Sequence, residues 1–234
     1  MAANTKSLQF GTSGTRDIPH QSYINFGSGS YTISFWFKKS SVPSARAPLF
    51  HKINSGNNWP LDLSIRESGS GVAGYIEVQQ WNGTTNPIWR TQQNVCDNSW
   101  HYITIVLNDS GTNRIAVDGV EKSTATHLAV TTANNVRLNS DSTGSSPSGF
   151  FIDELVIYNV VLSISEAYSR RNHDHAARGY SNLQGYYKLN DNTNDDSANA
   201  NHMTGTGGSF VTDVPFSTYE EPGGDMAIFF GSNF

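Results

Sequence analysis

The strongest constraint on the fold is a series of short segments in which apolar and polar side chains alternate. Residues 31–38 (YTISFWFK) place Ile33, Phe35 and Phe37 on one face of an extended chain, because successive side chains of a strand point to opposite faces. Strand character returns in four later segments, at residues 74–80, 100–107, 150–159 and 183–189. The sequence therefore predicts an all-β protein.

Short polar turns join several of these segments. Asp118 and Gly119 separate residues 114–117 from residues 120–123, and Asp-Gly is favoured in two-residue hairpins because both residues take positive φ. With the strand at residues 100–107, this pattern predicts an antiparallel meander. Only 15% of the residues are charged, well below the usual share of about 25%, and small polar residues fill the turns instead.

One short helix is predicted after the strand at residues 150–159. Ser163 and Glu166 have the spacing of a capping box, in which each side chain bonds a free backbone N–H of the first turn. Gly179 is a suitable residue to end the helix. A single helix of this length packs beside a sheet and does not define the fold.

Composition excludes several classes of partner. The formal net charge of −5 provides no basic surface for nucleic acid or anionic lipid. No apolar stretch approaches the roughly 20 residues needed to span a bilayer, so membrane insertion is not expected. Residues 1–10 carry one lysine and no apolar run, which does not match a secretory signal. Cys96 is the only cysteine, so no disulfide can form within the chain.

Four segments, taken in order, are similar to a known family. They are YTISFWFK at residues 31–38, Trp100-His101 followed by Val117-Asp118-Gly119-Val120, FIDELVIYN at residues 151–159, and YYKLNDNTNDDSANAN at residues 186–201. Together they resemble a laminin-G-like domain of the concanavalin A-like superfamily, over residues 8–210. In many relatives the aromatic strand and its Asp-rich loop come first, whereas here they come last.

The resemblance implies a jelly-roll of two antiparallel sheets, one of them concave, that binds ligands or assembles more often than it catalyses. We expect one laminin-G-like domain over residues 1–218, followed by a linker and an apolar tail over residues 219–234. The apolar residues of the tail are predicted to dock, either on the protein's own sheet or on a neighbour's by β-augmentation. They are Ile228, Phe229, Phe230 and Phe234.

A calcium site is predicted in the polar loop at residues 190–201. This loop offers hard oxygen ligands of the kind that calcium requires, and they are Asp195, Asp196, Asn199 and Asn201. The resemblance adds Asp153 of the Ile-Asp-Glu strand, so we expect a structural Ca²⁺ held by Asp196 and Asp153. The alternative is a solvated turn in which Asn and Asp side chains bond their own backbone.

Three tryptophans lie beside loop-forming residues and are candidates for glycan binding. Trp59, Trp81 and Trp89 would each offer a flat apolar surface to a sugar ring if they were exposed. The alternative is that they are buried, because a sandwich of this size needs an aromatic core.

The sequence does not favour catalysis. Retaining glycoside hydrolases need two carboxyl groups about 5 Å apart on either side of the sugar bond. Asp153 and Glu154 are adjacent, so on a regular strand they point to opposite faces. No other motif supplies a nucleophile or a phosphate site, and the chain is not expected to be an enzyme.

The leading functional prediction is a non-catalytic virion protein of a bacteriophage that decorates the capsid or tail surface and binds glycan weakly. It is expected in the virion, assembled with other virion proteins or with itself through the tail. The phage context comes from the family resemblance. The alternative is an extracellular carbohydrate-binding or adhesion module that recognises cell-surface glycan.

Overall fold

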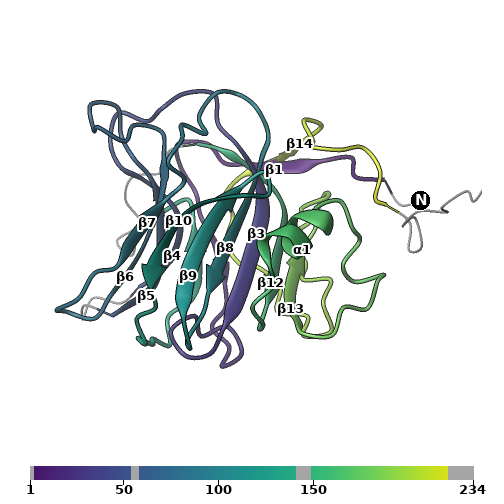
Figure 1. Ribbon diagram of the computed structural model, residues 1–234. Coiled ribbons are helices and arrows are strands. Elements are labelled where there is room, and N and C mark those ends of the chain that lie inside the picture. Colours follow the sequence, from purple (N-terminus) through teal and green to yellow (C-terminus); the bar gives the residue numbers. More distant parts are fainter. Residues whose placement is uncertain (1–2, 54–57, 141–148, 221–234) are drawn as a thin grey trace, which may run out of the picture.

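The protein is an antiparallel β-sandwich with one short helix beside it (Figure 1). The structure, a computed structural model, describes residues 3–53, 58–140 and 149–220. The predicted fold class is confirmed. The predicted docking residues Ile228, Phe229, Phe230 and Phe234 lie outside the described residues. Among the described helices, none has the length and apolar character to cross a membrane.

The larger sheet contains most of the strands that the sequence predicts. Its order is β10-β9-β8-β3-β12-β1-β14, and β13 also pairs with β12. The strands are β1 (Ser7–Gln9), β3 (Tyr31–Lys38), β8 (His101–Leu107), β9 (Thr112–Val117), β10 (Val120–Thr126), β12 (Phe151–Tyr158), β13 (Leu183–Tyr187) and β14 (Ser209–Val211). The predicted meander corresponds to β8, β9 and β10.

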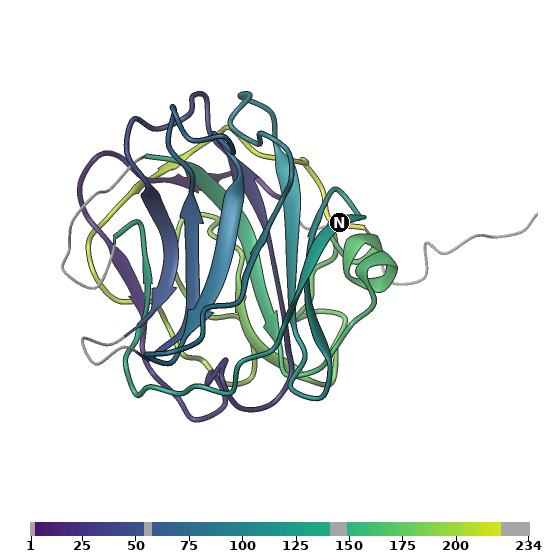
Figure 2. The ribbon, with the colours of Figure 1, turned by 60° about the vertical axis from the view of Figure 1, so that its left-hand side comes forward.

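The smaller sheet lies against the larger one, and Figure 2 turns it toward the viewer. Its order is β2-β11-β4-β5-β6-β7. The strands are β2 (Arg16–Ile18), β4 (Ala47–Lys52), β5 (Trp59–Ile65), β6 (Ile76–Trp81), β7 (Ile88–Arg90) and β11 (Val136–Leu138). Of these strands, the sequence predicts only β6.

The hydrophobic core fills the space between the two sheets. From β3, the predicted face of Ile33, Phe35 and Phe37 is buried in it. From the smaller sheet, Leu61 and Leu63 of β5 belong to the same cluster. Because these side chains recur every second residue, the residues between them point to the outer faces of the sheets.

A β-bulge in β12 corrects the predicted placement of Asp153 and Glu154. Asp153 pairs with Trp36 of β3 and Val156 pairs with Ser34, so two residues of β12 oppose one residue of β3. Glu154 has a φ of 51°, and the extra residue breaks the alternation of faces. Both carboxyl groups are therefore buried on the outer side of the larger sheet, whereas a regular strand would separate them.

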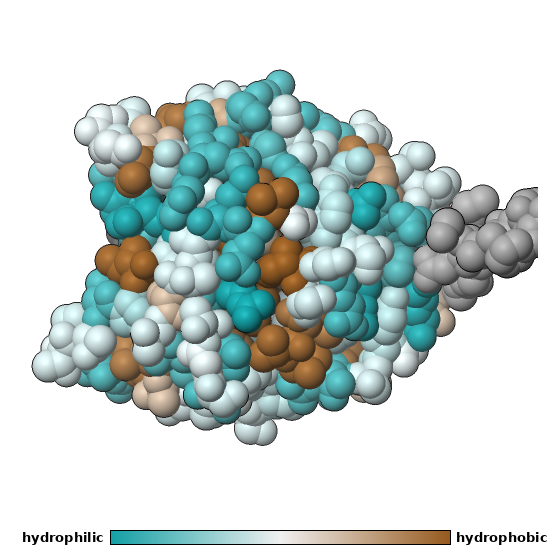
Figure 3. All heavy atoms as spheres, viewed as in Figure 1, coloured by the Kyte–Doolittle hydropathy of each residue, from teal (hydrophilic) through white to brown (hydrophobic). Residues whose placement is uncertain are grey.

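Helix α1 (Ile164–Ser169) and the segments that follow it cover this outer side. Ser163 is the N-cap, and its side chain accepts a hydrogen bond from the backbone N–H of Glu166, as the capping box predicts. The helix ends at Arg170, well before the predicted stop at Gly179. Figure 3 shows that apolar residues on this side of the molecule form small groups between hydrophilic ones.

The Trp-His and Asp-Gly motifs meet at the β9–β10 hairpin. Asp118 and Gly119 take φ values of 51° and 77°, as the predicted turn requires. Asp118 Oδ1 accepts the backbone N–H of Tyr102, and its Oδ2 lies 2.8 Å from His101 Nδ1. Asp97 Oδ1 lies 3.2 Å from the other ring nitrogen. The histidine thus connects the hairpin to the loop that precedes β8.

These contacts predict a pH-dependent contribution to stability. The hydrogen bond and charge of Asp118, with help from Asp97, outweigh partial burial and raise the pKa of His101. A histidine whose pKa is raised by folding stabilises the folded protein. This contribution is fully present below the unfolded pKa of about 6.5 and is lost as pH rises through the folded pKa. Between about pH 6 and pH 9, the free energy of unfolding of the unmodified protein should fall by up to about 1 kcal/mol more than that of His101→Gln. Chemical denaturation at both pH values tests this, and parallel losses in the two proteins would contradict it.

Candidate functional site

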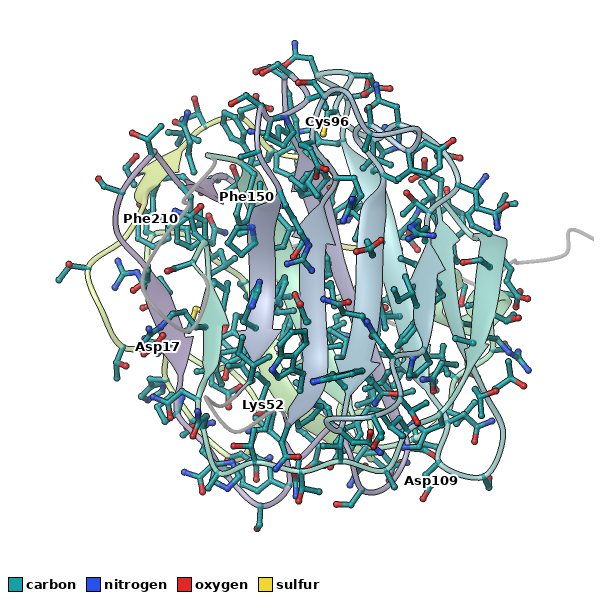
Figure 4. All side chains as sticks on the ribbon, turned by 90° about the vertical axis from the view of Figure 1, so that its left-hand side faces the viewer. Asp17, Lys52, Cys96, Asp109, Phe150 and Phe210 are labelled. Carbon is teal, nitrogen blue, oxygen red and sulfur yellow. The ribbon has the colours of Figure 1, made fainter. Side chains whose placement is uncertain are left out.

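Four polar side chains form a row across the outer face of the smaller sheet. The strand register pairs Arg137 with His51, His51 with Asp62, and Asp62 with Gln79. Residues paired in this way point to the same face of a sheet, and the neighbours of Asp62 along β5 belong to the core. Figure 4 views this sheet from outside, with Asp17 and Lys52 labelled on it.

Two carboxylates on this face are buried beneath arginines. Arg46 Nη2 lies 2.9 Å from Asp62 Oδ2, and Arg90 Nη2 lies 2.6 Å from Glu77 Oε2. Arg66 Nη1 also lies 3.3 Å from Glu77 Oε1. The side chains of the two carboxylates are only 2% and 3% exposed, whereas those of the arginines are 25–37% exposed. The carboxylates therefore hold the arginines in place and offer little surface of their own.

The electrostatics of Asp62 do not suit acid catalysis. Burial by itself raises its pKa, but the charges of His51 and Arg46 and a hydrogen bond from Gln79 lower the pKa below its usual value. A general acid of a glycoside hydrolase needs a raised pKa to carry a proton near neutrality. Asp62 acts instead as a fixed acceptor that orders its neighbours.

Trp59 and Trp81 form a pair at one end of this face. They are directly opposite each other on β5 and β6, with ring centroids 6.2 Å apart and planes inclined by 48°. A bulge between Trp59 and Asp62 brings Trp59 onto the outer face. Both rings are partly exposed, and neither indole N–H donates a hydrogen bond to another described residue. The pair therefore presents partly exposed apolar ring surface and two indole donors that have no acceptor among the described residues.

A pocket of about 360 Å³ adjoins the row of polar residues. It is lined by His51, Ile53, Ala133, Asn134, Asn135 and Arg137. Asn134 Nδ2 donates to the carbonyl oxygen of Ile53 at 2.7 Å, and the backbone N–H of His20 donates to Asn135 Oδ1 at 2.9 Å. These bonds fix the loop that forms one wall. Because Ile53 directly follows β4 and Trp59 begins the antiparallel neighbour β5, the pocket and the tryptophan pair lie toward the same end of the smaller sheet.

The structure corrects the prediction for Trp89. Its side chain is 1% exposed and belongs to the hydrophobic core between the sheets. On β7 it pairs with Val78, which is also in the core. A buried indole cannot offer a ring face to a sugar, so Trp89 is a core residue. The alternation along β7 gives no warning of this, because the strand has only three residues.

The structure places the predicted calcium ligands in different roles. Asp195 is buried and accepts hydrogen bonds from the backbone N–H groups of Tyr186, Ser197 and Asn201. The bond from Ser197, two residues further along, is a local side-chain-to-backbone bond of the kind found in turns. The side chain of Asn199 donates from Nδ2 to the backbone carbonyl oxygen of Gln184.

The two principal predicted ligands have other partners. Asp196 lies 3.7 Å from the ammonium group of Lys188, and Asp153 accepts a hydrogen bond from Asn4. Across the described ranges, no group of three or more His, Cys, Asp or Glu side chains is arranged to hold a metal. Calcium binding stays a prediction, and a calcium titration that raises the melting temperature would support it.

The Asp153–Glu154 pair is inaccessible to a substrate. Both side chains are buried, and Glu154 accepts hydrogen bonds from the hydroxyls of Tyr186 and Tyr219. Burial raises the pKa of Asp153, and burial together with the charge of Asp153 raises that of Glu154. Tyr219 lies just past the predicted domain end at residue 218, so packing of the sandwich reaches that residue.

These features define a class: a concanavalin A-like sandwich with a polar, tryptophan-flanked outer face on its smaller sheet. The model of the family described as the concanavalin A-like lectin/glucanases superfamily (Laminin_G_3) matches residues 10–167, more than half of the 234 residues. The chain belongs to this family. Among curated proteins, none matches the sequence.

Several solved structures share the fold at low sequence identity. A Bacteroides ovatus protein named as a candidate carbohydrate-binding protein superimposes with a TM-score of 0.70 at 16% identity, covering 92% of this chain and 61% of that one. The binding domain of Paraclostridial Mosquitocidal Protein 1 superimposes with a TM-score of 0.58 at 14% identity, covering 71% of this chain and 43% of that one. A heptameric SAP-like pentraxin from Limulus polyphemus superimposes with a TM-score of 0.53 at 12% identity, covering 71% of this chain and 82% of that one. The chain thus spans less than two thirds of the first two relatives.

Proposed function

We propose that this protein is a non-catalytic glycan-binding module that uses the outer face of its smaller sheet. The observation that carries the proposal is the Trp59–Trp81 pair, whose partly exposed rings lie toward the same end of the smaller sheet as the polar pocket. Sugar rings have apolar faces that stack on aromatic rings and hydroxyls that bond amides and charged groups. The name of the Bacteroides ovatus relative, a candidate carbohydrate-binding protein, supports the same function.

The absence of catalysis is part of the proposal. The carboxyl groups with raised pKa, Asp153 and Glu154, are buried on the other sheet, under the covering segments. On the proposed binding face, Asp62 has a lowered pKa and is held by Arg46 and Gln79. Neither set of carboxyl groups combines access to a sugar with the proton that hydrolysis requires.

The virion role remains a second candidate that rests on the sequence alone. Its docking residues belong to the tail at residues 221–234, outside the described residues. The geometry of the outer face supports glycan binding, rather than the virion role, as the leading function. A tail-mounted or capsid-mounted protein could carry the same glycan-binding face, so the two functions are compatible.

A glycan array followed by calorimetry tests the proposal. We expect Trp81→Ala to weaken the affinity for the best array ligand at least about tenfold, equal to about 1.4 kcal/mol. The matched control is Trp100→Ala, on the other sheet, where the indole N–H donates to Asp213. Unchanged affinity of Trp81→Ala, or an equal loss in Trp100→Ala, would contradict the assignment of the face.

A further inference from the structure

We infer that the outer face of the smaller sheet takes an uncharged oligosaccharide that lies across the strands. This inference rests on the proposed function and adds the chemical class and the direction of the ligand. Three observations carry it: the charge balance of the face, the amides around the pocket, and the span of neighbouring strands from the pocket to the tryptophan pair.

Each arginine on this face is matched by a carboxylate. Arg46 pairs with Asp62 and Arg90 pairs with Glu77, as described above. Arg66 Nη2 lies 3.2 Å from the carboxylate of Glu67 in addition to its contact with Glu77. At the pocket, Arg137 Nε and Nη2 lie 2.9 Å and 3.0 Å from the two carboxylate oxygens of Asp17.

This pairing removes the advantage of an acidic ligand. A uronate or sulfate group would have to compete with a carboxylate that is already in place and partly buried. It would also lose its own hydration without gaining a new unpaired cation. A neutral hydroxyl, by contrast, can accept from a guanidinium N–H that points outward and leave the ion pair intact.

Lys52 does not change this balance. Its ammonium group donates to the carbonyl oxygen of Asn134 at 2.6 Å and lies 3.0 Å from His20 Nδ1. The residue is fully buried, and burial lowers its pKa to about 8. Burial and the charge of Lys52 also lower the pKa of His20. A ligand anion in the pocket therefore cannot contact this cation, which supports the pocket wall from behind.

Asparagine amides surround the pocket and the neighbouring part of the row. Asn134 and Asn135 line the pocket, and Asn86 Nδ2 donates to Gln79 Oε1. All three asparagines are exposed. One amide atom of each has no hydrogen bond to another described residue. These atoms are Oδ1 of Asn86, Oδ1 of Asn134 and Nδ2 of Asn135. Two acceptors and one donor together suit hydroxyl groups, which both donate and accept.

The pocket and the tryptophan pair set the direction. Asp62 and Gln79 of the polar row are themselves buried, so a ligand would contact the pocket and the two rings. The pocket is lined by residues of β11 and β4, and Trp59 and Trp81 lie on β5 and β6, the next two strands of the sheet. Strands lie about 4.8 Å apart, so these four strands span about 14 Å. That length exceeds one sugar ring and suits a short oligosaccharide that crosses the strands.

Calorimetry with matched ligands tests the inference. The probes are neutral β-linked hexasaccharides of glucose, mannose, xylose and galactose, their monosaccharides, and hexasaccharides of uronic acids. We expect at least one neutral hexasaccharide to bind about tenfold or more tightly than any uronate. Its affinity should exceed that of its monosaccharide and should not change with salt. Preferred binding of a uronate that weakens with salt, or equal affinity for monosaccharide and hexasaccharide, would overturn the inference.

Asp17→Asn provides a charge variant. It removes the carboxylate partner of Arg137 at the pocket and keeps a side chain of the same shape. We expect its affinity for uronate hexasaccharides at low salt to rise at least about threefold above that of the unmodified protein, and to fall as salt is added. No gain in uronate affinity would show that the ion pairs do not set the selectivity, which contradicts the charge argument.

Failure of the inference is distinguishable from failure of the proposed function. If a uronate binds best and Trp81→Ala abolishes that binding, the face binds glycan and the inferred ligand class is wrong. If no probe and no array glycan binds, or if binding is insensitive to Trp81→Ala, the proposed function itself is wrong and the inference falls with it.

Discussion

Replacing Trp89 by alanine is expected to lower the free energy of unfolding by about 3–5 kcal/mol. The indole is 1% exposed and packs in the core between the two sheets. Its removal loses the transfer free energy of a large apolar group and leaves a cavity, because the surrounding strands relax only partly. Urea denaturation of the purified variant measures the effect.

Trp81→Ala is the matched comparison for Trp89→Ala. Trp81 is partly exposed at the end of the outer face, so its loss should change the free energy of unfolding by no more than about 1 kcal/mol while glycan binding is lost. Trp89→Ala, where it still folds, should lose stability and keep its affinity for glycan. A small stability loss in Trp89→Ala together with lost glycan affinity would mean that Trp89, and not the pair, contacts the ligand.

Glu154→Gln is expected to stabilise the protein at neutral and alkaline pH. The folded-state pKa values of Glu154 and Asp153 are raised, so the folded protein binds more protons than the unfolded one. Stability therefore falls as pH rises from the unfolded values of about 4 toward the folded values. Removing one ionisable group should therefore raise the free energy of unfolding at about pH 8 above that of the unmodified protein.

The amide of glutamine can keep the local hydrogen bonds. Its oxygen can accept from Tyr219, and its NH₂ group can donate to Tyr186, whose hydroxyl lies 3.3 Å from the carbonyl oxygen of His173. Near pH 4 the gain should shrink toward zero. The control is the exposed Glu121→Gln on β10, which should change stability by no more than about 0.5 kcal/mol at either pH. Destabilisation of Glu154→Gln at pH 8 would show that the charged form is the stabilising one.

The strands of the larger sheet could be predicted because their patterns are long and regular. β3 and β12 have eight residues each, enough for alternation to be recognised. The Asp118–Gly119 turn could be predicted because its backbone requirement is local. The β12 bulge could not, since no local turn motif in the sequence marks the positive φ of Glu154.

The proposed binding face was only partly predictable. Loop-forming neighbours indicate Trp59 and Trp81 as candidates for glycan binding, but the same criterion also selects Trp89, which is buried. Asp62 and His51 carry no local signal, because their role arises from the register of β4 against β5. The alternation of Leu61, Asp62 and Leu63 could have indicated an outward-facing carboxylate, although not the arginines that hold it.

Indole N–H resonances test most directly whether glycan binds at Trp59 and Trp81. The chain has five tryptophans, so an amide correlation NMR spectrum should contain five indole N–H resonances, which single Trp→Phe variants assign. On titration with the best neutral oligosaccharide, we expect shifts of the Trp59 and Trp81 resonances and none for Trp89, for Trp36 of β3 or for Trp100, which precedes β8. Saturable shifts confined to Trp36 or Trp100, with the pair unchanged, would contradict this expectation.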